Sequence, residues 1–198
     1  MTIGEILLNY DSDKNKGVTP EKNGHYYGDS YQEIFSKFDK NSNINIMEVG
    51  VQKGGSVSAW KDYFTNAFVL GIDIDDSRLE EYKRDDVEFI LSDIKDLSLK
   101  ENPLINDKLF DIIIDDGSHY TEDVVFFFEN YLDKLNINGY FIIEDTQSPG
   151  YCDNLISNKI DFLKQTKLKN EEFEMSIHDL RSKNNYYDDY LIIVKRIL

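Results

Sequence analysis

Short apolar runs that each end in an acid or a glycine recur along this chain, and stretches with helical character separate them. The runs occupy residues 44–50, 67–75, 87–93, 110–116 and 139–145. Runs of this length and composition are typical of buried strands in a parallel sheet that helices cover on both faces. Two further runs, residues 173–180 and 190–197, flank a polar turn and predict an antiparallel pair. The pattern predicts an α/β fold whose ligand lies at the carboxyl ends of the strands.

Helices are expected after the first and fourth of these strands. Ser56 is a suitable N-cap for a helix over residues 57–64, and Thr121 is a suitable N-cap for the helix that follows the fourth strand. A further helix is predicted within residues 154–168. The apolar face of the helix that starts at Thr121 consists of Val124, Phe128, Tyr131, Leu132 and Leu135.

Length and charge limit the organisation and the partners of the chain. Its 198 residues predict one α/β domain over residues 31–198, preceded by an irregular, lid-like segment over residues 1–30. Acids outnumber bases 38 to 22, and the formal charge of −16 disfavours nucleic acid and anionic membranes as partners. The first residues lack the pattern of a secretory signal, and Cys152 is the only cysteine, so we expect a cytoplasmic protein without an internal disulfide.

The glycine-rich turn after the first strand predicts a nucleotide-like cofactor. Gly50, Gly54 and Ser56 lie between strand and helix, where glycines let a ligand approach the backbone and the helix start offers free N–H groups. Asp73 ends the second strand 23 residues after Gly50, a distance typical of an acid that binds ribose hydroxyls. A purely structural turn is the alternative. The predicted cofactor-binding residues are Glu48, Gly50, Gly54, Ser56, Asp73, Asp93 and Asp115.

This glycine pattern favours one adenosine cofactor over others. Its spacing, E-x-G-x-x-x-G-G-S, is neither the P-loop pattern nor the G-x-G-x-x-G of NAD-binding turns. It is similar to the first motif of class I S-adenosylmethionine-dependent methyltransferases, so we expect S-adenosylmethionine in place of NAD.

A cluster of acids is expected where the fourth and fifth strands end. Asp116 follows the fourth strand, and Glu144 and Asp145 follow the fifth, so their carboxylates meet at one sheet edge. Converging acids without a basic partner are costly unless a cation neutralises them, and oxygen ligands suit Mg²⁺. His119 lies three residues after Asp116, close enough to act beside such an ion. An acidic rim exposed to solvent, with His119 capping the next helix, is the alternative.

The order of motifs resembles the macrocin and mycinamicin type of sugar O-methyltransferases, class I enzymes that methylate hydroxyls of deoxysugars. The resemblance covers residues 11–151 and rests on "SDK", "HYYGDSY", "MEVGVQKGGSVSAWKDYF", "GIDID", "DIIIDDGSH" and "GYFIIEDTQ". It implies a seven-stranded, Rossmann-like sheet with a reversed last strand, S-adenosylmethionine, and a divalent metal. It matches Asp116, Glu144 and Asp145 to the metal ligands and His119 to the catalytic base.

The expected activity is transfer of a methyl group to a hydroxyl of a sugar or sugar nucleotide, in carbohydrate biosynthesis. Two alternatives remain open at this point: a metal-dependent O-methyltransferase for catechol-like molecules, and a non-catalytic subunit that keeps the fold for binding. The substrate is expected to be a small molecule. Assembly into a homo-oligomer is left open.

Overall fold

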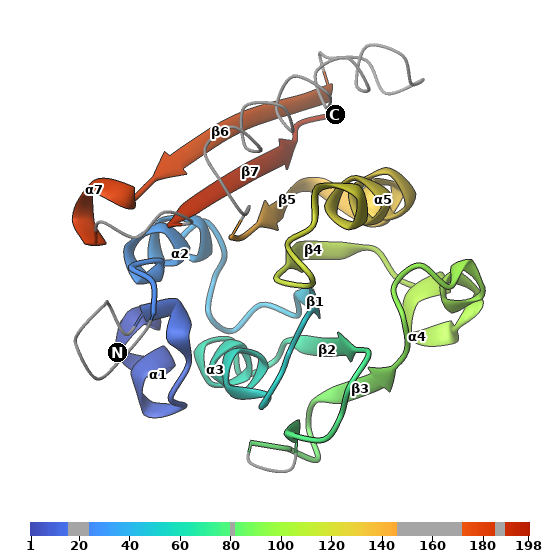
Figure 1. Cartoon of the computed structure of the whole chain (residues 1–198), viewed down its shortest axis with the longest axis horizontal. Helices are drawn as coiled ribbons and strands as arrows, with labels where there is room; N and C mark the ends of the chain where they lie inside the picture. The colour runs from blue at the N-terminus through green and yellow to red at the C-terminus, as the bar shows by residue number, and fades with distance from the viewer. Residues whose placement is uncertain (16–23, 80–81, 146–171, 185–188) are drawn as a thin grey trace.

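A mixed seven-stranded sheet forms the centre of the molecule in the computed structural model, which describes residues 1–15, 24–79, 82–145, 172–184 and 189–198 (Figure 1). The strand order across the sheet is β3-β2-β1-β4-β5-β7-β6. The strands are β1 (Asn45–Val49), β2 (Phe68–Asp73), β3 (Glu88–Leu91), β4 (Phe110–Asp115), β5 (Leu135–Ile143), β6 (Phe173–Asp179) and β7 (Tyr190–Arg196). All the strands predicted from the apolar runs are present, and β7 is the predicted reversed strand, antiparallel to both β5 and β6.

The parallel register brings the ends of the central strands together at one edge of the sheet. Val49, the last residue of β1, pairs with Ile72 in β2 and with Asp115 in β4. Asp115 in turn pairs with Ile143, the last residue of β5. Every acid or glycine that follows these strands therefore emerges at the same edge, as the sequence pattern predicted.

Helices cover the sheet on both faces (Figure 1). The helices α1 (Ile3–Asn9), α2 (Gly28–Phe35) and α3 (Gly55–Tyr63) lie on one face, and α4 (Pro103–Asn106) and α5 (Thr121–Tyr131) lie on the other. The short helix α7 (Arg181–Asn184) follows β6 and precedes β7 in the chain. Consecutive residues of β4 alternate between two buried clusters, with Ile112 and Ile114 on the first face and Ile113 on the second. This alternation explains why the strands read as continuous apolar runs.

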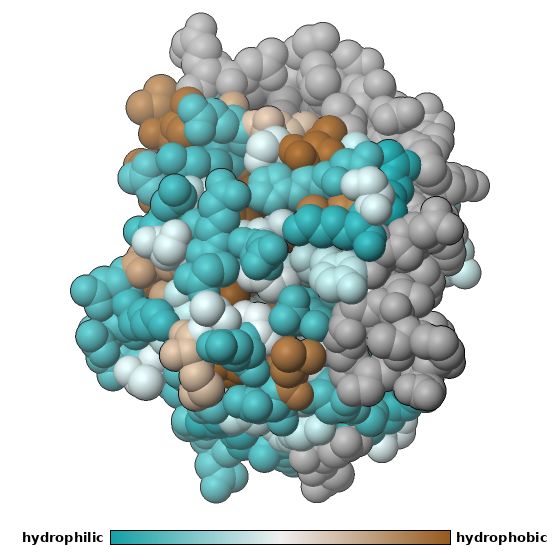
Figure 2. Space-filling view, turned by 90° about the vertical axis from the view of Figure 1, so that its left-hand side faces the viewer, coloured by the Kyte–Doolittle hydropathy of each residue, from teal (hydrophilic) through white to brown (hydrophobic). Residues whose placement is uncertain are grey.

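The outer side of the first helical layer is covered mostly by hydrophilic side chains (Figure 2). The apolar residues of this layer, among them Tyr31, Phe35 and Trp60, are instead fully buried against the sheet. No helix within the described ranges has both the length and the apolar composition that a membrane span requires.

The helix boundaries differ from the sequence-based expectations at three places. Ser56 and Thr121 are not N-caps, because the residues that precede each helix are Gly54 and Tyr120. The helix α5 ends at Tyr131, and Leu135 already belongs to β5. The helix predicted within residues 154–168 lies outside the described residues.

The N-terminal segment contains regular structure where an irregular one was expected. Thr2 caps α1 with a complete capping box, in which the Thr2 and Glu5 side chains accept hydrogen bonds from each other's backbone. A short 3₁₀ helix, η1 (Asp13–Asn15), follows, and α2 already begins at Gly28. The expectation of an irregular segment over residues 1–30 is therefore wrong for these residues. The proposed division into a lid and a domain stays a prediction.

Candidate active site

A cavity of about 570 Å³ lies at the sheet edge where β1, β2 and β4 end. Residues 10–14 of the N-terminal segment form part of its wall. The predicted site residues that line it are Gly50, Ser56, Asp73, Asp93, Asp115, Asp116, His119 and Asp145. The sheet therefore brings most of the predicted cofactor and metal residues to one cavity.

The turn after β1 is held in place by Asp73. One carboxylate oxygen of Asp73 accepts hydrogen bonds from the backbone N–H groups of Val51 and Gln52, at 2.9 Å each. Its other oxygen accepts from the N–H of Asp75 at 3.0 Å. The acid predicted to bind ribose is thus next to the glycine turn, and it also shapes that turn. The sequence did not indicate this second role.

Glycine is required at position 50 because the backbone of the turn after β4 passes close to it. Its φ is +85°, and a Cβ at this position would lie 1.9 Å from the backbone oxygen of Asp116. The absence of a side chain therefore lets the ends of β1 and β4 touch. In the turn after Asp116, Gly117 has no such constraint, because a Cβ there would approach other atoms no closer than 3.4 Å. The left-handed residue of that turn is His119, with a φ of 61°.

Glu48 was predicted to contact the cofactor, and its position does not support this role. Its side chain is fully buried and does not belong to the cavity wall. It accepts hydrogen bonds from the Ser56 hydroxyl at 2.6 Å and from the indole N–H of Trp60. Burial raises the pKa of Glu48, and a nearby ammonium group opposes that rise. Glu48 therefore ties β1 to α3 inside the protein. Gly54, also predicted for the cofactor, precedes α3 with a φ of +83° and lies outside the wall as well.

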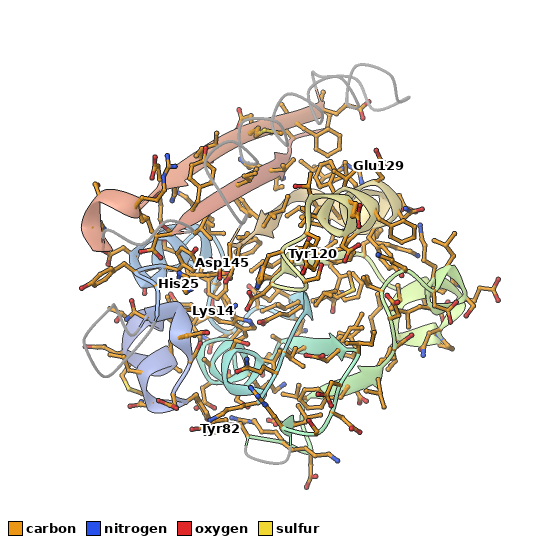
Figure 3. All side chains as sticks on the ribbon, viewed as in Figure 1. Lys14, His25, Tyr82, Tyr120, Glu129 and Asp145 are labelled. Carbon is orange, nitrogen blue, oxygen red and sulfur yellow. The ribbon has the colours of Figure 1, made fainter. Side chains whose placement is uncertain are left out.

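Lys14 lies among the acids at the ends of β1, β4 and β5, and the sequence analysis missed it (Figure 3). Its Nζ donates hydrogen bonds to Asp116 Oδ2 and, at 2.8 Å, to Glu144 Oε2, and lies 3.5 Å from Glu48 Oε1. Burial alone would lower the pKa of Lys14, but its acidic partners raise that pKa well above its usual value. The premise that these acids lack a basic partner is therefore wrong. The only signal in the sequence was the place of Lys14 in the "SDK" motif.

Glu144 was predicted as a metal ligand, but both of its carboxylate oxygens have partners inside the protein. One oxygen accepts from Lys14, and the other accepts from the hydroxyl group of Tyr31. The side chain is 1% exposed, and burial raises its pKa well above the usual value. This position gives Glu144 a role in holding Lys14 and Tyr31 rather than a direct place at the cavity.

Asp145 is tied to the N-terminal segment through His25, which is labelled near it in Figure 3, and through Tyr27. His25 Nε2 lies 3.2 Å from Asp145 Oδ2, and His25 Nδ1 lies 2.6 Å from Asp189 Oδ1. The Tyr27 hydroxyl donates to Asp145 Oδ1. Burial raises the pKa of Asp145 to about 7. Burial alone would lower the pKa of His25. Asp189 and Asp145 outweigh burial and raise this pKa to about 9, so the imidazole is protonated at neutral pH.

Asp116, His119 and Asp145 form a group that could hold a cation. One ligand atom from each lies within 4.8 Å of the others, and His119 Nε2 is 3.9 Å from Asp116 Oδ1. His119 and Asp145 have φ values of 61° and 50°, in the left-handed region that residues other than glycine rarely adopt. Two carboxylates and an imidazole fit a divalent ion. The group contains His119, which was predicted as a base. It does not contain Glu144, which was predicted as a metal ligand.

Comparisons with known proteins agree with this architecture. The sequence matches the family described as FtsJ-like methyltransferase over residues 31–191. It is 32% identical over 157 residues to the 8-demethyl-8-alpha-L-rhamnosyl tetracenomycin-C 2'-O-methyltransferase of Streptomyces olivaceus, covering 74% of this chain and 38% of that protein. It is 29% identical over 167 residues to the L-olivosyl-oleandolide 3-O-methyltransferase of Streptomyces antibioticus, covering 75% and 39%. The chain thus spans less than two fifths of these curated relatives.

The fold is also similar to that of a solved structure. The MycE methyltransferase from the mycinamycin biosynthetic pathway, in complex with Mg, SAH and mycinamycin VI, superposes with a TM-score of 0.75. Sequence identity is 21%, and the match covers 100% of this chain and 55% of MycE. This likeness confirms the α/β fold predicted from the strand pattern and the Rossmann-like methyltransferase fold that the family resemblance implied.

Proposed function

Because the chain belongs to the FtsJ-like methyltransferase family, we propose that it transfers a methyl group from S-adenosylmethionine to a hydroxyl of a sugar or sugar nucleotide. The names of its relatives, which methylate rhamnosyl and olivosyl groups, support a sugar as the acceptor. One observation carries the proposal. A single cavity wall combines the glycine turn and Asp73 with Asp116, His119 and Asp145.

The turn after β1 is the proposed place of S-adenosylmethionine. Asp73 accepts hydrogen bonds from the turn and keeps lone pairs for the ribose hydroxyls. Asp93 and Asp115 lie in the same wall, at the ends of β3 and β4. Gly50 and Ser56 would border the amino-acid end of the cofactor.

Asp116 and Asp145 are the proposed ligands of a divalent metal, for which Mg²⁺ is the candidate. When both groups are bound, the metal would supply positive charge at the acceptor oxygen and the sulfonium would supply the methyl group. Glu144, predicted as a third metal ligand, is connected to this group through Lys14, which it shares with Asp116.

His119 is the proposed base. Its Nε2 takes the proton of the acceptor hydroxyl as the oxygen forms its bond to the methyl carbon and the carbon–sulfur bond breaks. S-adenosylhomocysteine and protonated His119 are the other products, so the charge of the sulfonium ends on the imidazole. An imidazole accepts protons efficiently at neutral pH, and His119 Nε2 lies 3.9 Å from Oδ1 of the proposed ligand Asp116.

A product screen tests this function. The full chain is incubated with S-adenosylmethionine labelled in its methyl group, and with rhamnosides, sugar nucleotides and catechols as acceptors. Labelled sugar products identified by mass spectrometry support the proposal, and labelled catechols alone favour the catechol alternative.

The same screen applied to variants separates an enzyme from a non-catalytic subunit. Asp145→Asn is expected to lose product formation while it still binds S-adenosylhomocysteine. Asp123→Asn is a matched control, because Asp123 also lines the cavity but pairs with Lys95 outside the proposed ligand group. No labelled product from any acceptor, with the cofactor bound, would point to a binding subunit.

A further inference from the structure

Lys14 is a buried cation supplied by the N-terminal segment to the ends of the central strands. It belongs to η1, and its side chain is 2% exposed. Its acidic partners come from three strands: Glu48 from β1, Asp116 from the end of β4, and Glu144 from the end of β5. A charged amine this deeply buried is tolerated only when it is paired and hydrogen-bonded, and Lys14 meets both conditions.

Lys14 connects two acids that have different relations to the cavity. Asp116 belongs to the group that could hold a cation, together with His119 and Asp145. Glu144 does not belong to that group, and it is bound by Lys14 and Tyr31. The ammonium therefore neutralises part of the acidic cluster and occupies one oxygen of Asp116.

We propose that Lys14 is the resident counter-cation of the metal site. The Lys14 ammonium keeps Asp116 and Glu144 together when no divalent ion is bound, and it weakens the binding of that ion. The inference rests on the metal site of the proposed function. Two effects act in the same direction. The ammonium repels a second cation nearby, and its hydrogen bond engages an Asp116 oxygen that would otherwise be free to bind the ion. The protein therefore stays folded without metal and exchanges the metal readily.

Removal of the ammonium should make the fold depend on metal. Lys14→Met keeps the length and apolar character of the side chain and leaves the acids without their cation. In EDTA, its Tm is expected to fall by about 6–20 °C, the scale for breaking a buried pair in a chain of this size. Added Mn²⁺ should restore most of this loss and should raise the Tm of the variant by more than it raises that of the wild type. Mn²⁺ affinity, measured by calorimetry on the metal-free protein, should increase at least about 10-fold.

Lys95→Met is the matched control. Lys95 also lines the cavity, but its side chain is 45% exposed and it pairs with Asp123. This change removes the same charge without freeing Asp116 or Glu144, so Mn²⁺ affinity should change by less than about 2-fold because solvent screens an exposed charge. Lys14→Gln, which retains a hydrogen-bond donor and loses the charge, should behave like Lys14→Met.

The outcomes distinguish this inference from the function on which it rests. Weaker Mn²⁺ binding by Lys14→Met than by the wild type would overturn the inference, because Lys14 would then help to position the ligands. The inference is also overturned if both Lys14 variants stay unfolded at saturating Mn²⁺. Refolding of these variants by Mn²⁺ supports the inference. If the wild type binds Mn²⁺ and Asp116→Asn does not weaken that binding, the proposed metal site fails. In that case a Lys14 effect on Mn²⁺ affinity is not expected either.

Discussion

Replacement of Gly50 by alanine should be one of the most destabilising small changes that this chain can undergo. A Cβ at Gly50 would lie 1.9 Å from the Asp116 oxygen, 2.5 Å from its carbonyl carbon and 2.9 Å from the Gly117 Cα, all of them backbone atoms that cannot rotate away. The φ of +85° adds strain, because alanine disfavours the left-handed region by about 1–2 kcal/mol. Overpacking costs about 1–3 kcal/mol more.

These two costs together predict a loss of about 2–5 kcal/mol in the free energy of unfolding. For a chain of this length, each kcal/mol lowers the Tm by about 2–4 °C, so the expected decrease is about 4–20 °C by differential scanning calorimetry. Because the clash is with Asp116, Mn²⁺ affinity should fall as well.

Gly117→Ala is the matched control for this prediction, since Gly117 lies in the same contact between β1 and β4. A Cβ there would approach Asp115 Oδ1 to 3.4 Å and Val49 Cγ1 to 3.6 Å, which are ordinary contacts. The Tm of Gly117→Ala should stay within about 2 °C of the wild type, as is usual for a substitution that introduces neither a clash nor backbone strain. A Gly50→Ala protein as stable as the wild type, or equal losses in the two variants, would refute the reasoning.

Three further predictions concern the proposed chemistry. His119→Ala should lower the methylation rate by about 10²–10⁴-fold with little change in Mn²⁺ affinity, and a parallel loss of Mn²⁺ binding would make His119 a ligand instead of the base. Asp73→Ala should weaken S-adenosylhomocysteine binding at least about 10-fold, or about 1.4 kcal/mol, by calorimetry, and an unchanged affinity in a folded protein would remove Asp73 from the cofactor site. Excess EDTA should abolish turnover and Mg²⁺ or Mn²⁺ should restore it, whereas full activity in EDTA would contradict the metal site.

The features of the fold that could be predicted from the sequence are those that depend on neighbouring residues. The run over residues 110–116 is apolar because β4 is buried on both faces, and the acid that follows it emerges at the edge where parallel strands end. The cavity wall could be predicted for the same reason. The caps were misassigned because a hydroxyl near a helix start has other partners available, and that of Ser56 binds Glu48.

The features that could not be predicted depend on contacts between distant parts of the chain. Lys14 is separated by 102 residues from Asp116, and nothing local to "SDK" indicates a buried ammonium. The same holds for Tyr31 and Glu144, which are 113 residues apart. The positive φ of His119 could not be predicted either, because glycine adopts such a φ most readily and Gly117 lies two residues earlier in the same turn.

The distance along the chain between Lys14 and Glu144 has a consequence for the synthesis of the protein. The two residues are 130 positions apart. At a translation rate of about 5–20 residues per second, Lys14 is added to the chain roughly 7–26 s before its last acidic partner. During that interval the Lys14 ammonium can pair with Glu48 and, once it is made, with Asp116, but not with Glu144. The contacts of Lys14 with the strand ends are therefore completed late in the synthesis of the chain, and a ribosome that stalls before residue 144 holds a nascent protein whose Lys14 ammonium lacks its partner Glu144.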